Sequence, residues 1–269
     1  MGSWTLDDIS WQRFDGAKVA PELLRIVKAA SLVEQNGADY ARYLCGVFHD
    51  DAAFQAVALS WGAEEVQHGA ALGRWAMLAD PGFDHAAASA RFTAGYRVDR
   101  DATKSVRGSR VGELVARCIV ETGTSSYYTA LAEAAEEPVL RQICQKIAAD
   151  ELRHYKLFYT HLKRYLDSEH VGTLRRLAVA LGRVGESEDD ELAYAYYAAN
   201  EPALPYERRR YARAYARRAY AVYRRHHVER GMAMLLKAVG LKPNGRLSRW
   251  STALAWWGMQ RRAHSLARA

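Results

Sequence analysis

Residues 150–154 read DELRH and residues 64–68 read EEVQH, so the chain carries the motif Glu-x-x-His twice. On a helix, residues three positions apart lie on one face, so the Glu and the His of each motif can bind the same ion. One such motif would indicate little, because Glu and His are common on surface helices. The repeat is more informative, because a further Glu precedes each copy of the motif at a similar distance.

A lone Glu precedes each motif. Glu34 lies 31 residues before Glu65, and Glu121 lies 30 residues before Glu151. If each half folds at the midpoint of this interval into two antiparallel helices, the lone Glu and the motif lie at one height, roughly 20–23 Å above the turn at 1.5 Å per residue. Four carboxylates and two imidazoles then meet inside a four-helix bundle, which is the ligand set of a carboxylate-bridged di-iron or di-manganese site.

The spacing therefore predicts six metal ligands: Glu34, Glu65, His68, Glu121, Glu151 and His154. Glu65 and Glu151 are expected to bridge two ions, and each His is expected to supply one nitrogen ligand. Carboxylates with one imidazole per ion favour iron or manganese over zinc or copper. Burying four carboxylates without a cation would be very costly, which argues against a chance arrangement.

An acidic residue comes directly before each motif, at Glu64 and Asp150. Ligating histidines usually donate their second N–H to a carboxylate or a carbonyl. Asp150 is therefore a candidate partner for His68. Glu64 is a weaker candidate for His154, because it could equally face solvent. Arg153, inside the second motif, is expected to pair with a buried carboxylate.

Composition favours an all-α protein, because the 269 residues are 49% hydrophobic with only 19 Gly and 6 Pro. The three cysteines form no C-x-x-C pair, which indicates a reducing compartment and no structural zinc site. The N-terminus lacks the pattern of a secretory signal. No stretch reaches the ~18–20 apolar residues that cross a bilayer. We therefore expect a cytoplasmic protein, either free or peripheral to a membrane.

The chain is expected to divide into a leader at residues 1–19, a ferritin-like four-helix bundle at 20–169 and a helical extension at 170–269. The connection at 80–109 is long enough to carry the chain back along the bundle, as the crossover of ferritin-like proteins does, and its part at 86–96 can be helical. The expected bundle helices are 21–48, 51–79, 111–135 and 138–166, and the expected helices of the extension are 171–184, 187–200, 206–239 and 247–266.

Residues 139–158, VLRQICQKIAADELRHYKLF, resemble the fourth bundle helix of soluble acyl-carrier-protein desaturases, whose signature is I-C-x-x-I-A-A-D-E-x-R-H. Residues 63–69, AEEVQHG, are similar to the E-E-x-x-H-G segment of that family. Residues 121–124, ETGT, are similar to its third-helix motif, a ligand Glu followed three residues later by a Thr. The resemblance covers roughly residues 20–166, so it does not reach the extension.

This resemblance implies a di-iron centre that activates O2 with electrons from an external donor such as ferredoxin, and it implies the same six ligands. Thr124 matches the threonine beside the oxygen-binding face, where it could deliver a proton. The hydroxyl of Thr124 could equally bond back to a carbonyl of its own helix. Manganese in place of iron stays open.

The extension is strongly basic: residues 206–269 hold 16 Lys/Arg and 2 Asp/Glu, whereas residues 1–165 hold 19 and 21. Such a balance points to an acidic partner, either an acyl carrier protein or an anionic membrane surface. An RNA backbone is less favoured because no RNA-binding motif is present, and a plain solvated helix face is the alternative. The last helix, with tryptophans flanked by arginines, fits a membrane-surface element and a cap on a substrate channel equally well.

The leading functional hypothesis is a di-iron oxidoreductase that desaturates or hydroxylates an acyl chain or another lipid-like substrate. The alternatives are a ferritin-like iron-handling or peroxide-scavenging protein, a di-iron hydroxylase of tRNA or another small molecule, and a non-catalytic adaptor that acts through its basic extension. A homodimer is compatible with each of these. The sequence does not identify the substrate.

Overall fold

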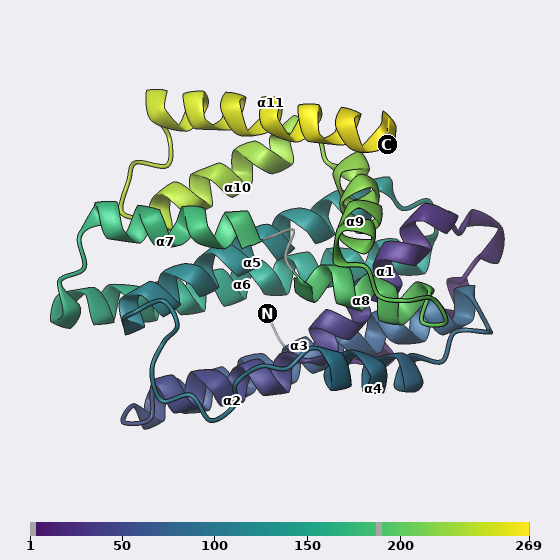
Figure 1. Cartoon of the computed structure of the whole chain (residues 1–269), viewed down its shortest axis with the longest axis horizontal. Helices are drawn as coiled ribbons and strands as arrows, with labels where there is room; N and C mark the ends of the chain where they lie inside the picture. Colours follow the sequence, from purple (N-terminus) through teal and green to yellow (C-terminus); the bar gives the residue numbers. More distant parts are fainter. Residues whose placement is uncertain (1–3, 187–189, 269) are drawn as a thin grey trace.

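The computed structural model describes residues 4–186 and 190–268, and within these ranges all the regular structure is helical (Figure 1). The predicted all-α bundle is thus confirmed. The leader forms short 3-10 turns at Leu6–Asp8, Trp11–Arg13 and Gly16–Lys18. The α-helices are α1 (Pro21–Gln35), α2 (Gly37–Val47), α3 (Ala52–Ala79), α4 (His85–Gly95), α5 (Arg110–Ala134), α6 (Pro138–Glu169), α7 (Thr173–Gly185), α8 (Asp190–Asn200), α9 (Arg208–Val222), α10 (Arg225–Ala238) and α11 (Arg246–Arg268).

The bundle consists of two helix pairs, α1 and α2 packed on α3, and α5 packed on α6. Both turns lie at the midpoints expected from the sequence. Asp51 caps α3 by accepting a hydrogen bond from the Phe54 N–H, as a short acidic side chain at a helix N-terminus does. Pro138 begins α6, where its fixed φ suits the first helical turn and its missing N–H costs nothing.

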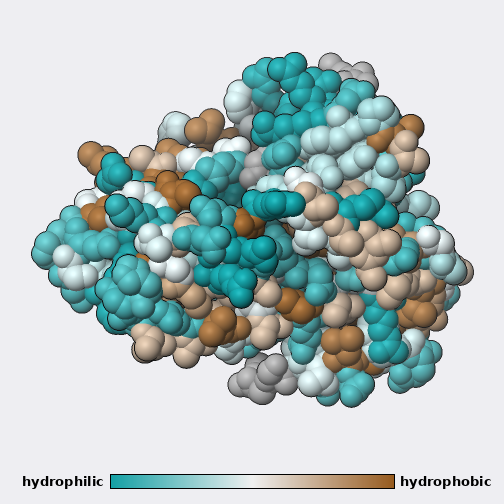
Figure 2. Space-filling view, turned by 60° about the horizontal axis from the view of Figure 1, so that its bottom comes forward, coloured by the Kyte–Doolittle hydropathy of each residue, from teal (hydrophilic) through white to brown (hydrophobic). Residues whose placement is uncertain are grey.

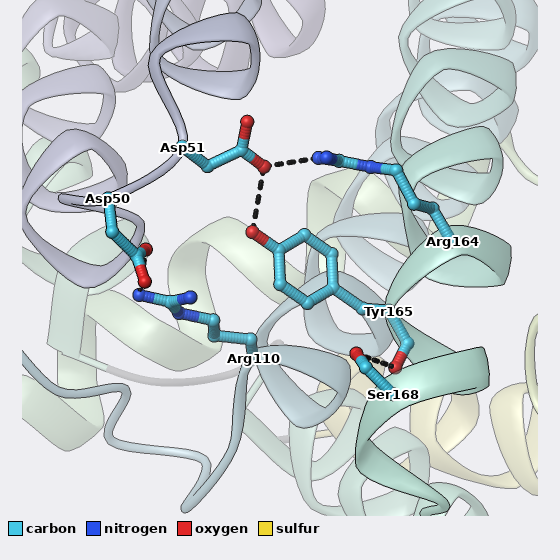
Figure 3. A pocket seen from close by; sticks show the side chains of 6 residues that line it. All are labelled: Asp50, Asp51, Arg110, Arg164, Tyr165 and Ser168. Carbon is cyan, nitrogen blue, oxygen red and sulfur yellow. Dashed lines mark hydrogen bonds and ion pairs between the residues drawn. The ribbon is translucent and has the colours of Figure 1, made fainter.

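The connection between the pairs is a crossover, as predicted. Arg110, the first residue of α5, donates to the Val47 carbonyl (3.1 Å) and to Asp50 (2.5 Å), both beside the start of α3; Figure 3 shows Arg110 next to Asp50. Helices α3 and α5 therefore begin at the same end of the bundle and run parallel. Residues 80–109 return the chain along the bundle, and α4 forms within them, close to the helical segment expected at 86–96.

The first bundle helix was predicted to be continuous over residues 21–48, but in the structure it breaks at Asn36. Asn36 has φ −82° and ψ 4°, and its N–H bonds to the Val33 carbonyl three residues back (3.1 Å). The break lies next to Gly37, where the backbone packs tightly on α3. A Cβ at this position would lie 2.3 Å from the Cβ of Glu65. The backbone can approach α3 at this height only with glycine at position 37.

The extension also differs from the prediction, because the helix expected at 206–239 breaks into α9 and α10 at Tyr223. Arg224, the N-cap of α10, donates its N–H to Nδ1 of His227 (3.0 Å). No Gly or Pro marks this break, so composition and periodicity could not reveal it. Helices α7 and α8 match the expected pair, although residues 187–189, where the second was expected to begin, lie outside the described residues.

A buried polar layer divides the bundle core into two apolar clusters. Ile26, Leu72 and Trp75 belong to one cluster, and Phe54 and Phe158 belong to the other. On the side of α2, α3 and α4, hydrophobic residues are dispersed among hydrophilic ones (Figure 2). None of the helices in the described part of the chain has both the length and the apolarity that crossing a bilayer requires.

Candidate metal centre

The polar layer contains the predicted ligands, and the structure brings all of them together. They come from four helices and are buried, each at most 7% exposed: Glu34 on α1, Glu65 and His68 on α3, Glu121 on α5, and Glu151 and His154 on α6. Their common height follows from helix geometry, because each lone Glu and its motif lie at similar distances from the turn between their helices.

These side chains form two overlapping groups, in each of which one potential ligand atom per residue lies within 4.8 Å of the others. The first group is Glu34, Glu65, His68 and Glu151, and the second is Glu65, Glu121, Glu151 and His154. Glu65 and Glu151 belong to both groups, and they are the two residues expected to bridge a pair of ions. Such sharing is what a carboxylate-bridged centre needs.

The histidines are oriented with Nδ1 toward this centre. His68 Nδ1 lies 3.3 Å from an oxygen of Glu151, and His154 Nδ1 lies 3.0 Å from an oxygen of Glu65. The Nε2 atoms point outward, 3.1 Å from Asp150 and 2.7 Å from Glu64 respectively. The carboxylate beside each Nε2 accepts a hydrogen bond from that nitrogen, so a ring that becomes neutral carries its lone pair on Nδ1, facing the centre.

The polar atoms that face the interior of this centre indicate whether metal ions fit there. The inward-facing atoms are buried and make no hydrogen bond within the described part of the chain: Oε1 of Glu65 and Glu151, both carboxylate oxygens of Glu121, and Nδ1 of His68 and His154. Lone pairs that converge in this way in a dry interior repel each other unless a cation lies between them. The residues present therefore fit a pair of metal ions bound by oxygen and nitrogen.

In the metal-free protein, burial and the repulsion between these carboxylates shift the pKa values of the candidate ligands. Burial, and then the charge of Glu65, raise the pKa of Glu34 to about 8. Burial and the charge of Glu151 raise the pKa of Glu121 well above the usual range of a carboxyl group. Burial by itself would lower the pKa of His68, but the carboxylates around the ring outweigh it and raise that pKa. Without metal, the centre therefore retains protons that metal ions would displace.

We expect opposite pH trends with and without metal. Without metal, the folded state keeps a proton on Glu34 up to about pH 8, whereas an unfolded Glu releases it near 4.5. The folded state then binds more protons, so the free energy of unfolding falls as the pH rises through this window. Metal binding needs deprotonated ligands and so strengthens as the pH rises. Thermal midpoints measured across this window should fall for the apoprotein and not for the iron-loaded protein, and parallel trends would contradict the assignment.

Asp150, Glu64 and Arg153 lie beside the candidate ligands. Asp150 is the partner of His68, and Glu64 is the partner of His154. Arg153 donates to both carboxylates and so links the two histidine partners. Burial would raise the pKa of Asp150, but the hydrogen bonds from His68 and Arg153 outweigh it and lower that pKa to about 2. Asp150 therefore stays ionised and can hold the proton of His68 on Nε2.

Sequence reasoning missed Trp4, whose indole N–H donates to Asp150 (2.7 Å). Its ring also stacks beside His68, with the ring centroids 5.9 Å apart. The leader thus completes a hydrogen-bonded chain from Trp4 through Asp150 to a candidate ligand. Nothing in the sequence indicated this contact, because Trp4 lies 146 residues from Asp150 in a segment without a regular period.

Two hydroxyl groups of α5 bond to candidate ligands. The hydroxyl of Thr124 donates to Glu151 (2.5 Å) and also lies 3.1 Å from the Val120 carbonyl, so both roles considered for it are geometrically open. The hydroxyl of Tyr128 donates to Glu34 (2.5 Å) and was not predicted. Tyr128 lies two helical turns after Glu121, and this spacing of seven residues could have placed it on the ligand face.

The fold and the centre define an all-α protein with a buried carboxylate and histidine site compatible with metal binding. A family model described as fatty acid desaturase matches residues 46–183, which is more than half of the chain. The chain therefore belongs to the fatty acid desaturase family. The matched region contains five of the six candidate ligands, and Glu34 lies before it. No curated protein shows significant similarity to the chain.

Proposed function

We propose that this protein is a ferritin-like di-iron oxidoreductase that uses O2 and external electrons to desaturate an acyl chain or a similar lipid-like substrate. Family membership supports the acyl chain and desaturation, and hydroxylation is the closest variant of the same chemistry. The observation that carries the metal assignment is the set of buried oxygen and Nδ1 atoms that face each other without hydrogen bonds.

When bound, two iron ions would supply the O2 chemistry that an unactivated C–H bond requires. The side chains hold and orient this group. Glu65 and Glu151 would bridge the ions, and the pairs His68–Asp150 and His154–Glu64 would keep each imidazole proton on Nε2. The apolar clusters on both sides of the layer would exclude water, which strengthens the electrostatic interactions inside and limits side reactions.

The proposed reaction is tested by supplying the iron-loaded protein with O2, a ferredoxin-type reductant and long-chain acyl thioesters. Desaturation gives a product lighter by two hydrogen atoms, and hydroxylation gives one heavier by an oxygen atom. Substrate should also stimulate oxygen consumption. Oxygen or peroxide consumption without any modified acyl chain would contradict the proposal and favour an iron-handling or peroxide-scavenging protein.

Thr124 is proposed to hold the proton that its hydroxyl shares with Glu151. Thr124→Val should therefore lower turnover by roughly tenfold or more, as the loss of a proton-transferring group does, while iron binding is retained. Thr124→Ser should restore much of the activity. Thr129→Val is a matched control, because the hydroxyl of Thr129 bonds only back to the Ser125 carbonyl of the same helix (2.7 Å). Equal turnover in Thr124→Val and the control would show that Thr124 is only structural.

A further inference from the structure

Helix α11 directs large apolar side chains into solvent. Leu247 is 54% exposed, Trp250 79%, Leu254 66% and Trp257 55%. They follow one another at steps of three, four and three residues, so they form a single row along one face of the helix. We call these four residues the α11 stripe. A row of this kind on a soluble protein marks an interaction surface.

The other side of α11 packs on α9 and α10. Its described buried residues are Ser248, Thr252 and Leu266, so two of the three are polar. A surface helix normally buries its apolar face, but α11 keeps the stripe in solvent, and Trp256 and Met259 are only partly buried. The exposure of both stripe tryptophans also argues against the cap on a substrate channel that the sequence left open, since a cap would bury them.

The surroundings of the α11 stripe are positively charged. Arg246, Arg249 and Arg261 are exposed, and the guanidinium of Arg261 lies 4.8 Å from the centre of the Trp257 ring. Residues 246–268 contain no Asp or Glu, and residues 206–269 hold 16 Lys/Arg against 2 Asp/Glu. This charge favours an anionic partner and disfavours a second copy of the same helix, whose arginines would repel these.

The α11 stripe runs along a long helix at the edge of the molecule, so it can contact a flat partner. Helix α11 is 23 residues long, or about 35 Å at 1.5 Å per residue, and it lies along the outer edge of the molecule (Figure 1). On a bilayer, leucines enter the acyl boundary, tryptophans lie at the headgroup level and arginines bind lipid phosphates. We propose that the α11 stripe and its arginines dock the protein on the surface of an anionic phospholipid bilayer.

Docking is independent of the metal centre, so the test uses the full chain without any activity assay. Co-sedimentation with vesicles of phosphatidylglycerol and phosphatidylcholine should show binding that weakens with added salt, because salt screens the arginines. Vesicles of phosphatidylcholine alone should bind much more weakly. Equal binding to both kinds of vesicle would overturn the role of charge, and no binding to either would overturn the proposal.

Leu247→Ala/Leu254→Ala should weaken vesicle binding by about tenfold or more, because two leucines no longer enter the bilayer. Leu59→Ala/Leu78→Ala is the matched control, since these leucines of α3 are 57% and 43% exposed but lie outside the α11 stripe. Arg246→Gln/Arg249→Gln should weaken binding to anionic vesicles by about tenfold and reduce its salt dependence. Circular dichroism verifies that each variant keeps its helical content.

Three results would overturn the bilayer proposal. The first is an equal loss of binding in the α3 control pair. The second is self-association that Leu247→Ala/Leu254→Ala abolishes without any effect on vesicles, which would assign the α11 stripe to a second copy of the chain. The third is that Leu247→Ala/Leu254→Ala abolishes binding to a purified acidic acyl carrier protein but leaves vesicle binding unchanged. This result would assign the α11 stripe to a protein partner.

Discussion

Glu151→Ala is expected to abolish metal binding at the whole centre, because Glu151 belongs to both groups of candidate ligands. We expect about two iron ions per chain in the wild-type protein after anaerobic reconstitution, and almost none in this variant. Glu34→Ala should have a smaller effect, since Glu34 belongs to one group only and the second ion keeps its ligands. Metal analysis of the desalted proteins measures both outcomes, and a wild-type metal content in Glu151→Ala would refute the assignment.

Stability gives a second readout that distinguishes lost ligands from a lost fold. In the metal-free protein Glu151 is 1% exposed, with one oxygen that makes no hydrogen bond. Burial, and then the charges of Glu65 and Glu34, raise the pKa of Glu151 above its ordinary value, and removing this carboxylate relieves both costs. The apo form of Glu151→Ala should therefore be at least as stable as the wild-type apoprotein. Adding iron should raise the thermal midpoint of the wild type only.

Glu137→Ala is expected to cause the largest loss of stability, about 3–5 kcal/mol. The Glu137 side chain is 1% exposed and accepts hydrogen bonds from the Trp75 indole (2.7 Å) and from the Leu140 N–H (2.7 Å), and it also accepts from the N–H groups of Val139 and Asp15. The substitution removes the cap of α6 and leaves a buried indole N–H without a partner. Chemical denaturation of the apoprotein measures the change.

The neighbouring residue provides the control for this prediction. Glu136 is exposed, so Glu136→Ala should change the free energy of unfolding by no more than about 0.5 kcal/mol. Glu137→Gln keeps one carbonyl acceptor and should lie between the two. If Glu137→Ala cost less than about 1 kcal/mol, water or another group would have to satisfy the Trp75 indole.

The bundle and the meeting of its polar residues were predictable because they depend on helix geometry. The rise per residue and the position of each turn set the height of every residue on its helix. The nearly equal spacing of Glu34 and Glu121 from their motifs therefore placed six side chains in one layer before any packing was known. The crossover was predicted from length, since the connection at residues 80–109 is long enough to carry the chain back along the bundle.

The remaining contacts could not be read from periodicity. The break at Asn36 lies where Gly37 closely approaches α3. The break at Tyr223 separates α9, which packs on α8, from α10, which packs on α5. Trp4 reaches Asp150 from an irregular segment, whose path is decided by the surface it covers. Each contact joins segments that are far apart in the chain or not helical, so helix geometry alone does not relate them.

Helix α11 shows most clearly which properties the sequence determines and which depend on the tertiary structure. Its sequence determined that tryptophans, leucines and arginines would share one helix, because helix period and composition are local properties. Only the tertiary structure decided which side faces outward, because that depends on how α11 packs against α9 and α10. The side that packs contains Ser248 and Thr252, which leaves Trp250 and Trp257 in solvent. A surface helix normally turns its apolar residues toward the core, whereas the packing of α11 leaves these two tryptophans exposed.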